Sequence, residues 1–429
     1  MASGRRSTTV ASAVERVVGS DLPIALEAYD GSRLGPVGAP ATLLVRSPDA
    51  IRRIASSPGE LGLGRAYVAG DLDVRGDIYV ALEALRARLP RVQLTPAAWL
   101  EIARLAGVDL VRPLPPPREE ARLSGVRHSR RRDRQAIAHH YDVSNRFYEI
   151  VLGPSMTYSC AVWRDAESSL EEAQAAKHEL VCRKLGLEDG MRLLDVGCGW
   201  GALAMHAATH HGTSAVGITL SRRQVEWAGK AIAEAGLADR LEVRLQDYRD
   251  VRDGPFDAIS SIGMFEHVGL RNLGLYFRRL HGLLPPGGRL LNHGISRPAR
   301  RSDRARRGAP TTPARLRRNS FVDRYVFPDG ELHEVGAVIS TMQASGFEVR
   351  HVESLREHYA LTLRAWVANL ERGWDEAVAE AGAGRARVWR LYMAASALNF
   401  EAGRTQVHQV LAVRPDRGRS RMPLRPRFE

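Results

Sequence analysis

Apolar and polar positions alternate regularly along the second half of the chain. From residue 191 onward, short apolar runs typical of strands are separated by longer segments with apolar residues at helical spacing. Such alternation is typical of βαβ units, so we predict an α/β fold with a doubly wound parallel sheet. Helical patterns across 362–403 precede a last strand at 405–413. The other predicted strands are 191–196, 214–219, 241–246, 256–262, 288–293 and 347–354.

The N-terminal part carries a weaker pattern. Strand-like runs at 22–28 and 41–45 accompany helical segments at 48–54 and 78–87. The proline-rich segment that follows is stiff, extended and unable to continue a helix. We therefore predict a smaller N-terminal α+β domain over 1–111, a Pro/Arg-rich linker over 112–134, and a larger α/β domain over 135–429 with helical insertions and a basic tail.

The first strand of the α/β part runs directly into three alternate glycines. Asp195 lies near its end, and Gly197, Gly199 and Gly201 follow before a helical pattern begins. Glycine lacks the Cβ atom that would keep a ligand off the backbone, and it adopts the positive φ angles of a tight turn. The segment therefore predicts a nucleotide-type cofactor loop. Ligands of such sheets lie at the carboxyl ends of the strands, so we expect these segments to lie together: 197–201, 219–224, 246–248 and 263–266.

The chain is strongly basic. Its formal net charge of +13 arises from 62 Lys plus Arg against 49 Asp plus Glu, and nearly all the basic residues are arginines. Charge alone indicates an anionic partner, either nucleic acid or a phospholipid surface, without choosing between them. Two arginine-rich runs, 130–134 and 297–318, are compatible both with solvated loops and with a grip on anionic lipid headgroups.

Cysteine usage and hydropathy bear on the compartment. Cys160, Cys182 and Cys198 are too few and too scattered for a disulfide framework, and none forms a metal-binding CxxC pair. The N-terminus lacks the apolar core of a signal peptide, and the sequence has no apolar stretch long enough to span a bilayer. We therefore expect a cytoplasmic protein without a bound metal, with any membrane contact peripheral and at the inner membrane surface.

Five separated motifs resemble the cyclopropane-fatty-acyl-phospholipid synthase family. The resemblance covers roughly residues 135–413. The N-terminal part and the run 321–333 are similar to the actinobacterial branch, which includes enzymes making 10-methylene or 10-methyl acids of the tuberculostearic type. The resemblance implies a class I methyltransferase fold that uses S-adenosylmethionine. The motifs are His140-Tyr141-Asp142, Tyr158-Ser159-Cys160, the glycine loop, Gln246-Asp247-Tyr248-Arg249-Asp250 and Gly263-Met264-Phe265-Glu266-His267-Val268-Gly269.

The resemblance also implies a substrate and a set of cofactor-binding residues. The substrate would be the cis double bond of an unsaturated acyl chain held in a phospholipid. By similarity, the three glycines contact the amino-acid and ribose portions of the cofactor, residues 219–224 border the ribose, and the methionine end is closed over by residues 158 and 159. The implied residues are Tyr158, Ser159, Asp195, Gly197, Gly199, Gly201, Thr219, Leu220, Gln224 (in place of the usual ribose-binding acid), Gln246, and, beside the adenine, Asp247 and Tyr248.

Methyl transfer to an alkene leaves a carbocation-like centre, and a base must then remove a proton. In this family the base is a bound bicarbonate ion. By resemblance, the residues that hold it are Cys160 (through its backbone), Glu266, His293, Ile295 and Tyr359. Each of them, taken alone, could also have a purely structural role. Gly294 stands where cyclopropane-forming relatives often have Thr, so we expect an enlarged or reshaped pocket.

The fate of the cation decides the product. Ring closure gives a cyclopropane, whereas a hydride shift followed by loss of a methyl proton gives an exomethylene. Resemblance in 288–296 and 321–333 favours the 10-methylene product, on which a separate reductase would act, with the cyclopropane as the alternative. Family members are often dimeric, so a homodimer is expected. The N-terminal domain is compatible with bilayer docking, acyl-chain extraction or dimer formation.

Two other functions compete with lipid methylation. A basic class I methyltransferase could act on RNA or DNA. The sequence has no Asn-Pro-Pro-Tyr or Asp-Pro-Pro-Tyr motif and no recognisable RNA-binding module, so we expect no nucleic-acid partner. A non-catalytic lipid-binding protein is the second alternative, and the intact glycine loop argues against it.

Overall fold

The computed structural model describes residues 9–88, 105, 114–121, 123–126, 128–141, 143–299 and 320–428. The chain forms two compact units, and both are discontinuous in sequence. Unit 1 comprises Met1–Ala121, Pro313–Val326 and Ala377–Leu398, and unit 2 comprises the rest. This division differs from the predicted boundaries at 111 and 134, because two late segments of the chain pack with the N-terminal one. The periodicity of apolar residues along the sequence cannot show that late segments pack with the N-terminal one.

Unit 1 is built on a four-stranded sheet with the order β2-β1-β3-β4 among its described residues. Strands β1 and β3 are parallel, and the other neighbours are antiparallel. The predicted strands at 22–28 and 41–45 and helices at 48–54 and 78–87 are confirmed, while α1, β2, α3 and β4 were not predicted. The elements are α1 (Val10–Val18), β1 (Ala25–Ala28), β2 (Arg33–Leu34), β3 (Ala41–Val45), α2 (Pro48–Ser56), α3 (Glu60–Ala69), β4 (Leu72–Gly76), α4 (Ile78–Arg88), α13 (Phe321–Tyr325) and most of α17 (Ala383–Glu401).

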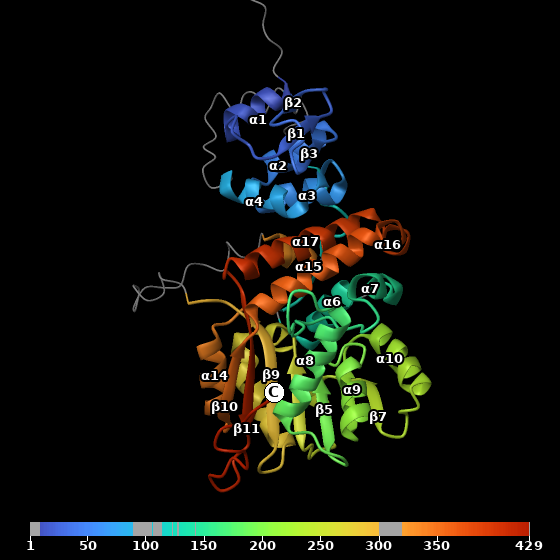
Figure 1. The fold of residues 1–429 in the computed structure, drawn as a ribbon, viewed down its shortest axis with the longest axis vertical. Helices are drawn as coiled ribbons and strands as arrows, with labels where there is room; N and C mark the ends of the chain where they lie inside the picture. Colours follow the sequence, from blue (N-terminus) through green and yellow to red (C-terminus); the bar gives the residue numbers. More distant parts are fainter. Residues whose placement is uncertain are drawn as a thin grey trace, which may run out of the picture. The chain divides into compact units, whose positions relative to one another are not determined.

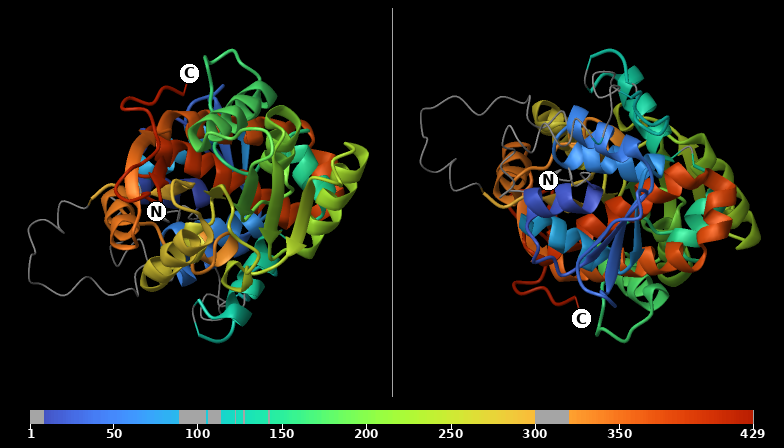
Figure 2. Two further views of the ribbon diagram at one scale, coloured as in Figure 1. Left: turned by 90° about the horizontal axis from the view of Figure 1, so that it is seen from below. Right: turned by 90° about the horizontal axis from the view of Figure 1, so that it is seen from above.

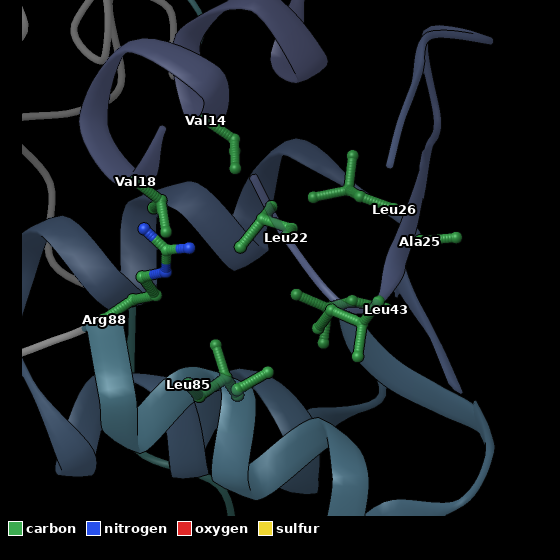
Figure 3. A pocket seen from close by; sticks show the side chains of 10 residues that line it. Val14, Val18, Leu22, Ala25, Leu26, Leu43, Leu85 and Arg88 are labelled. Atoms are coloured by element: carbon green, nitrogen blue, oxygen red, sulfur yellow. The ribbon is translucent and has the colours of Figure 1, made fainter. Parts of the chain in front are cut away.

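A small apolar pocket lies inside unit 1 between α1, the sheet and α4 (Figure 3). Arg88 is the charged residue at its margin. The other lining residues are Val14, Val18, Leu22, Ile24, Ala25, Leu26, Leu43, Ala84 and Leu85. None of the predicted catalytic or cofactor-binding residues belongs to this unit.

Unit 2 contains a seven-stranded sheet with the order β10-β11-β9-β8-β5-β6-β7 among its described residues (Figure 1). The six strands predicted from residue 191 onward and the last strand are all confirmed, and so is the α/β fold class. Strand β11 runs antiparallel to both of its neighbours, so the sheet is mixed at that end. The strands are β5 (Arg192–Val196), β6 (Ser214–Thr219), β7 (Leu241–Leu245), β8 (Ala258–Ile262), β9 (Arg289–Ser296), β10 (Glu348–Ser354) and β11 (Gln406–Val413).

Helices cover both faces of this sheet (Figure 2). Leu193 and Leu291 face a core shared with α8, α9 and α10, whereas their neighbours Leu194 and Leu290 face a core shared with α11 and α14. Adjacent strand residues point to opposite faces, so buried strands read as continuous apolar runs. The helices of unit 2 are α6 (Arg130–Tyr141), α7 (Asn145–Leu152), α8 (Leu170–Leu185), α9 (Ala202–His211), α10 (Arg222–Glu234), α11 (Leu273–Leu283), α14 (Val335–Ala344) and α15 (Arg356–Arg372), with short helices η3 (Tyr248–Asp250), η4 (Phe265–His267) and η5 (Leu270–Asn272). Helix α16 (Trp374–Ala381) belongs to unit 1 from Ala377 onward.

Local sequence fixes both ends of α8. Ser169 accepts a hydrogen bond from the Glu172 amide, and the Glu172 side chain accepts one from the Ser169 amide, which forms a capping box. Gly186 ends the helix in the left-handed conformation at φ +64°. Since α8 packs across β8 and β9, its side chains are held above the middle of the sheet.

Two arginines of the run 130–134 are paired with acids inside unit 2. Arg130 binds Asp250 at 2.9 Å, and Arg132 binds Asp329. These contacts favour a structural role over a grip on lipid headgroups. The other run, 297–318, lies outside the described residues except for its first three positions, and its Arg297 lies 3.3 Å from Glu334. The described part of the chain contains no helix long and apolar enough to cross a bilayer.

Candidate active site

The glycine loop connects β5 to α9 and has the expected backbone. Gly197, Gly199 and Gly201 all have positive φ angles, of +80°, +57° and +83°. The amides of Gly197 and Cys198 donate to the Ile218 carbonyl at 2.9 and 3.1 Å, which ties the loop to the end of β6. A Cβ atom at position 199 would meet no other atom within 4 Å, so the loop leaves open space on that side. No side chain caps the start of α9.

The ends of β6 and β7 lie beside this loop. The Gln246 amide donates to the Thr219 carbonyl at 3.0 Å. The Thr219 hydroxyl donates to Gln224 Oε1 at 2.6 Å, and both side chains are buried. Leu220 is half-buried in the turn between them. The structure therefore brings together the segments 219–224 and 246–248, as the parallel sheet requires.

Asp247 and Tyr248 begin the short helix η3. Arg249 donates to Asp247 Oδ1 at 2.8 Å and to Oδ2 at 2.6 Å, and it also binds Asp133 at 3.1 Å. These contacts hold the pKa of Asp247 below its usual value against the opposing effect of burial. The Asp247 carboxylate is therefore ionised and oriented by Arg249. The Tyr248 ring is buried and packs edge-on against Tyr276.

Lys177 of α8 connects three of the predicted segments. Its Nζ donates to the Ser159 hydroxyl at 3.2 Å, and its charge acts on Asp195 and on His293. Lys177 is fully buried, and burial lowers the pKa of its ammonium to about 7. Gln174, one turn earlier, donates to the Ser159 carbonyl at 3.0 Å. Lys177 and Gln174 thus hold the 158–160 segment, and the sequence motifs did not mark either residue.

Asp195 is buried near the end of β5 on the face covered by α8. Ser260 Oγ of β8 donates to its Oδ1 at 2.7 Å. Burial raises the pKa of Asp195 to about 6, while the Ser260 hydroxyl and the Lys177 charge act in the opposite direction. The Asp195 carboxylate is therefore held by groups inside the protein. It is not exposed at the glycine loop, where a residue that contacts the cofactor directly would lie.

Glu266 and Ile295 are in direct contact. Glu266 Oε1 accepts the backbone N–H of Ile295 at 2.6 Å, and Glu266 Oε2 is buried with no partner among the described residues. Burial raises the pKa of Glu266 to about 7, so near neutrality a large share of this carboxyl is protonated and can donate a hydrogen bond. The Ile295 amide is taken by Glu266 and is not available to a ligand.

His293 lies inside β9, opposite Ile262, the last residue of β8. Its Nδ1 lies 3.2 Å from Gln409 Nε2 of β11, so the amide donates to Nδ1 and the proton of the neutral ring is on Nε2. Gln409 in turn accepts from the buried Lys184 at 2.7 Å. Burial lowers the pKa of His293 to about 3, so the imidazole is neutral and presents one N–H donor.

Cys160 and Tyr359 meet around Leu355. The Cys160 thiol donates to the carbonyls of Ala161 and Leu355 at 3.2 and 3.6 Å, and the Tyr359 amide donates to the same Leu355 carbonyl at 3.1 Å. Burial raises the pKa of Cys160 well above its ordinary value, so the thiol does not supply a thiolate. The Tyr158 and Tyr359 rings lie 5.3 and 6.0 Å from the buried Trp366 ring, which brings the two segments to one place.

The space that Gly294 leaves is filled. A Cβ atom at this position would lie 1.7 Å from the Phe265 ring, which is buried next to Glu266. Gly294 therefore admits the Phe265 ring, so that the site is reshaped and not enlarged at this point. The side chains of the His140-Tyr141-Asp142 motif lie outside the described residues.

The donor set fits a small anion. Two buried groups can donate hydrogen bonds to an anion. One is the protonated Glu266 carboxyl, whose Oε2 has no partner among the described residues, and the other is the neutral His293 ring, whose proton is on Nε2. The open side of the glycine loop and the uncapped start of α9 fit a nucleotide-type ligand.

Comparison with known proteins gives a consistent result. The family model for mycolic acid cyclopropane synthetase matches residues 128–410. A probable fatty acid methyltransferase of Mycobacterium tuberculosis is 48% identical over 94% of this chain and 94% of its own length. The tuberculostearic acid methyltransferase UfaA1 of that organism is 32% identical, over 95% and 92%. The cyclopropane-fatty-acyl-phospholipid synthase of Escherichia coli is 34% identical, over 87% and 88%.

A solved structure agrees with this result. Mycolic acid cyclopropane synthase CmaA1, complexed with SAH and CTAB, superposes with a TM-score of 0.60 at 35% identity. The match covers 65% of this chain and 98% of that one. The shared part is thus almost the whole of the solved protein, and this chain has additional residues.

Proposed function

This chain belongs to the mycolic acid cyclopropane synthetase family, and we propose that it methylates the cis double bond of an unsaturated acyl chain held in a phospholipid. Membership makes it an S-adenosylmethionine-dependent methyltransferase of fatty acids or lipids. The phospholipid substrate is suggested by the name of the Escherichia coli relative. One observation carries the proposal: the buried Glu266 of η4 has an unpartnered oxygen and accepts a hydrogen bond from Ile295 of β9, the strand that carries a neutral His293.

The proposed cofactor region is the carboxyl edge of β5, β6 and β7. S-adenosylmethionine supplies an electrophilic methyl group when it is bound. Gly197, Gly199 and Gly201 would let the ligand approach the backbone, and Gln224 would border its ribose. Asp247 and Tyr248, which follow Gln246, would border its adenine. Lys177 and Gln174 position Tyr158 and Ser159, which we propose close over the methionine end. Asp195 would act through Ser260 and Lys177, which makes it a positioning residue.

The proposed base site is formed by Glu266, His293, Tyr359 and the backbone of Cys160. Bicarbonate, when bound, supplies the base that the carbocation-like centre requires. The neutral His293 would donate from Nε2, and the protonated Glu266 would donate from the oxygen that lacks a partner. Ile295 would act indirectly, since its amide orients Glu266. The apolar surroundings of these groups exclude water, which would otherwise quench the cation.

The 10-methylene product is the finer part of the proposal. It is supported by similarity to the tuberculostearic acid methyltransferase, while the likeness to cyclopropane synthases supports ring formation as the alternative. A 10-methylene chain would be the substrate of a separate reductase. A homodimer is proposed by analogy with the family.

The test is a reconstituted reaction. The full chain is incubated with methyl-labelled S-adenosylmethionine, bicarbonate and vesicles of oleoyl phospholipid, and the released fatty acids are analysed by mass spectrometry. We expect a labelled gain of one CH2 unit, with ozonolysis yielding the ketone of an exomethylene chain. Bicarbonate-free buffer should slow the reaction, and the Glu266→Gln variant is the matched control for the base site.

Each outcome has a distinct meaning. A ring product that resists ozonolysis would replace the methylene product by a cyclopropane. Full activity without bicarbonate would refute the proposal that bicarbonate is the base. In a parallel reaction that contains RNA beside the vesicles, label in RNA and none in lipid would establish the nucleic-acid alternative.

Peripheral attachment to an anionic membrane is proposed from the arginines of 297–318. Changing pairs of these arginines to glutamate should reduce co-sedimentation with anionic vesicles, because each basic residue near such a surface contributes about 1 kcal/mol. Arg130→Glu is the control, since Arg130 already pairs with Asp250. Unchanged sedimentation of the paired variants would refute this attachment.

A further inference from the structure

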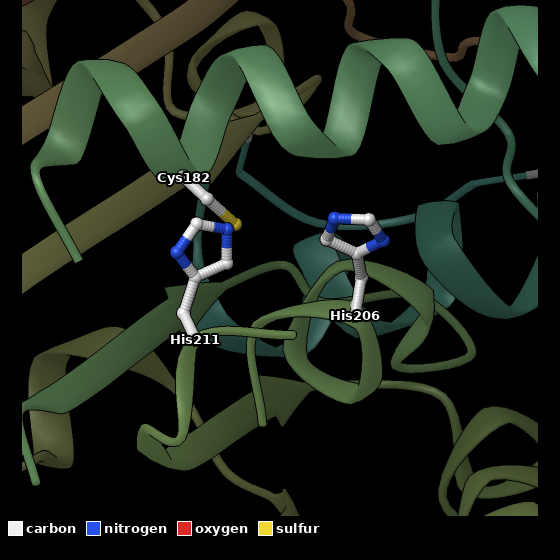
Figure 4. Close-up of side chains that lie close together, drawn as sticks. All are labelled: Cys182, His206 and His211. Carbon is white, nitrogen blue, oxygen red and sulfur yellow. The ribbon is translucent and has the colours of Figure 1, made fainter. Parts of the chain in front are cut away.

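Four side chains of metal-binding type meet between α8 and α9, separately from the residues assigned above. Glu179 and Cys182 lie one turn apart on α8, and His206 and His211 lie on α9. One potential ligand atom from each of Cys182, His206 and His211 lies within 4.8 Å of the other two. Figure 4 shows both imidazole rings turning a nitrogen toward the Cys182 sulfur.

Glu179 offers a fourth ligand atom through its contacts with the two histidines of this cluster. Its Oε2 lies 3.2 Å from His206 Nε2 and 3.0 Å from His211 Nε2, so one oxygen contacts both rings. Its Oε1 accepts from Arg183 at 2.7 Å, which holds the carboxylate with Oε2 directed at the histidines. The Cys182 side chain is buried, while the other three are partly exposed and accessible from solvent.

The spacing suits a tetrahedral transition metal. Bonds of about 2.0–2.3 Å to zinc place the ligand atoms about 3.3–3.7 Å apart. Glu179 Oε2 already lies at nearly this distance from each of the two histidine nitrogens. The separations that involve the Cys182 sulfur need to shorten, those to the two nitrogens by up to about 1 Å from at most 4.8 Å. Rotation of the partly exposed Glu179, His206 and His211 side chains can provide this.

We propose that Glu179, Cys182, His206 and His211 bind one zinc-class divalent metal ion per chain. One sulfur, two imidazole nitrogens and one carboxylate oxygen complete four-coordination, so the site is a closed, structural one. The sequence did not reveal it, because the ligands come from two helices and include no CxxC pair. This proposal is independent of the proposed methyl transfer.

The metal would tie α8 to α9. Helix α9 begins directly after Gly201 of the glycine loop, and α8 carries Lys177, which contacts Ser159. Metal binding is therefore expected to stiffen the two helices from which the cofactor region is built. In the structure, Arg183, His206 and His211 form a hydrogen-bonded cluster around the Glu179 carboxylate.

Cobalt(II) substitution tests the proposal. The full chain, without a histidine tag, is stripped with a chelator and titrated with cobalt(II) while the absorption spectrum is recorded. We expect strong visible bands of tetrahedral cobalt and a thiolate-to-cobalt band in the near ultraviolet, saturating at one ion per chain. Zinc(II) should abolish both bands and should raise the melting temperature of the stripped protein with increasing concentration.

Variants identify the ligands. Cys182→Ser should remove the thiolate band, and His211→Gln should weaken cobalt binding by on the order of 100-fold. His210→Gln is the matched control, because His210 is exposed, adjacent to His211 and outside the ligand set. Far-ultraviolet circular dichroism checks that each variant is folded.

The wild-type spectrum decides the question even if a variant fails to fold. Weak bands of octahedral cobalt without a thiolate band would mean adventitious binding to surface histidines and would refute the site. Equal loss of affinity in the His210 and His211 variants would refute the ligand set.

Discussion

At Gly199 the backbone has a φ of +57°, and a Cβ atom would enter open space. Gly236, in the turn after α10, has a φ of +68° and equally open surroundings. The two residues therefore share the same backbone requirement, but only Gly199 belongs to the glycine loop. They form a matched pair for testing the cofactor site.

We predict that Gly199→Ala and Gly236→Ala each lower the free energy of unfolding by about 1–2 kcal/mol, since an L-residue is strained at positive φ. Only Gly199→Ala should weaken binding of S-adenosylmethionine, by about tenfold or more, because its methyl group occupies the ligand's side of the loop. Calorimetric titration measures the affinities. Equal affinities in the two variants would place the cofactor elsewhere.

Glu266 gives a pH dependence that can be measured without turnover. Its folded pKa of about 7 lies above the ordinary value of 4.5, so the folded state holds a proton that the unfolded state has lost between these pH values. The wild-type free energy of unfolding should therefore fall as pH rises from about 4.5 to 7, by up to about 3 kcal/mol relative to Glu266→Gln. Below and above this window the difference should be constant.

Urea unfolding of both proteins at a series of pH values measures this difference. A difference that does not vary with pH would mean that Glu266 is ionised in the folded protein. An ionised Glu266 could not donate a hydrogen bond to the bicarbonate, so the proposed base site would be refuted.

At the scale of elements, β9 and the short helix η4 fit together through Gly294 and Phe265. A Cβ atom on residue 294 would overlap the Phe265 ring. We predict that Gly294→Ala destabilises the protein by about 1–3 kcal/mol through overpacking. The added Phe265→Leu change should recover part of this loss, giving a coupling energy of about 0.5 kcal/mol or more in a double-mutant cycle.

Gly282 of α11 provides the control for this cycle. A Cβ atom there meets nothing within 4 Å and the φ is not positive, so Gly282→Ala should stabilise the helix by about 0.5–1 kcal/mol. Additive effects of Gly294→Ala and Phe265→Leu would contradict the contact between β9 and η4.

At the scale of the whole molecule, the two units do not correspond to two halves of the chain. Within unit 1, Arg390 of α17 donates to the Tyr67 hydroxyl at 3.1 Å and to the Val74 carbonyl at 3.3 Å. Trp389 and Met393 of the same helix are buried. A helix near the C-terminal end thus completes a unit whose sheet comes from the N-terminal end.

We predict that deletion of residues 1–121 leaves a poorly soluble protein, because the apolar side chains of 377–398 lose their partners. The measurements are the soluble fraction, binding of a hydrophobic dye and the melting temperature. Co-expression of residues 1–121 as a separate chain should restore solubility. A soluble fragment with the melting temperature of the full chain would show that the late segments do not depend on residues 1–121.

The sequence by itself determined the α/β fold, the strands of unit 2 and the position of the glycine loop. These features depend on local periods of apolar residues and on the absence of Cβ atoms at three nearby positions, and both can be read along the chain. The motif residues at the ends of the strands were also predictable, because parallel strands bring their carboxyl ends to one edge.

Only the tertiary structure decided how these residues are used. Lys177 and Gln174 hold Ser159, Lys184 orients His293 through Gln409, and Phe265 fills the space above Gly294. The tertiary structure also decided that residues 377–398 pack with unit 1 and that Cys182 lies beside two histidines. Each depends on contacts between residues far apart in sequence, and burial then sets the pKa values of the groups that meet. A pattern read along one chain contains neither the contacts nor the burial.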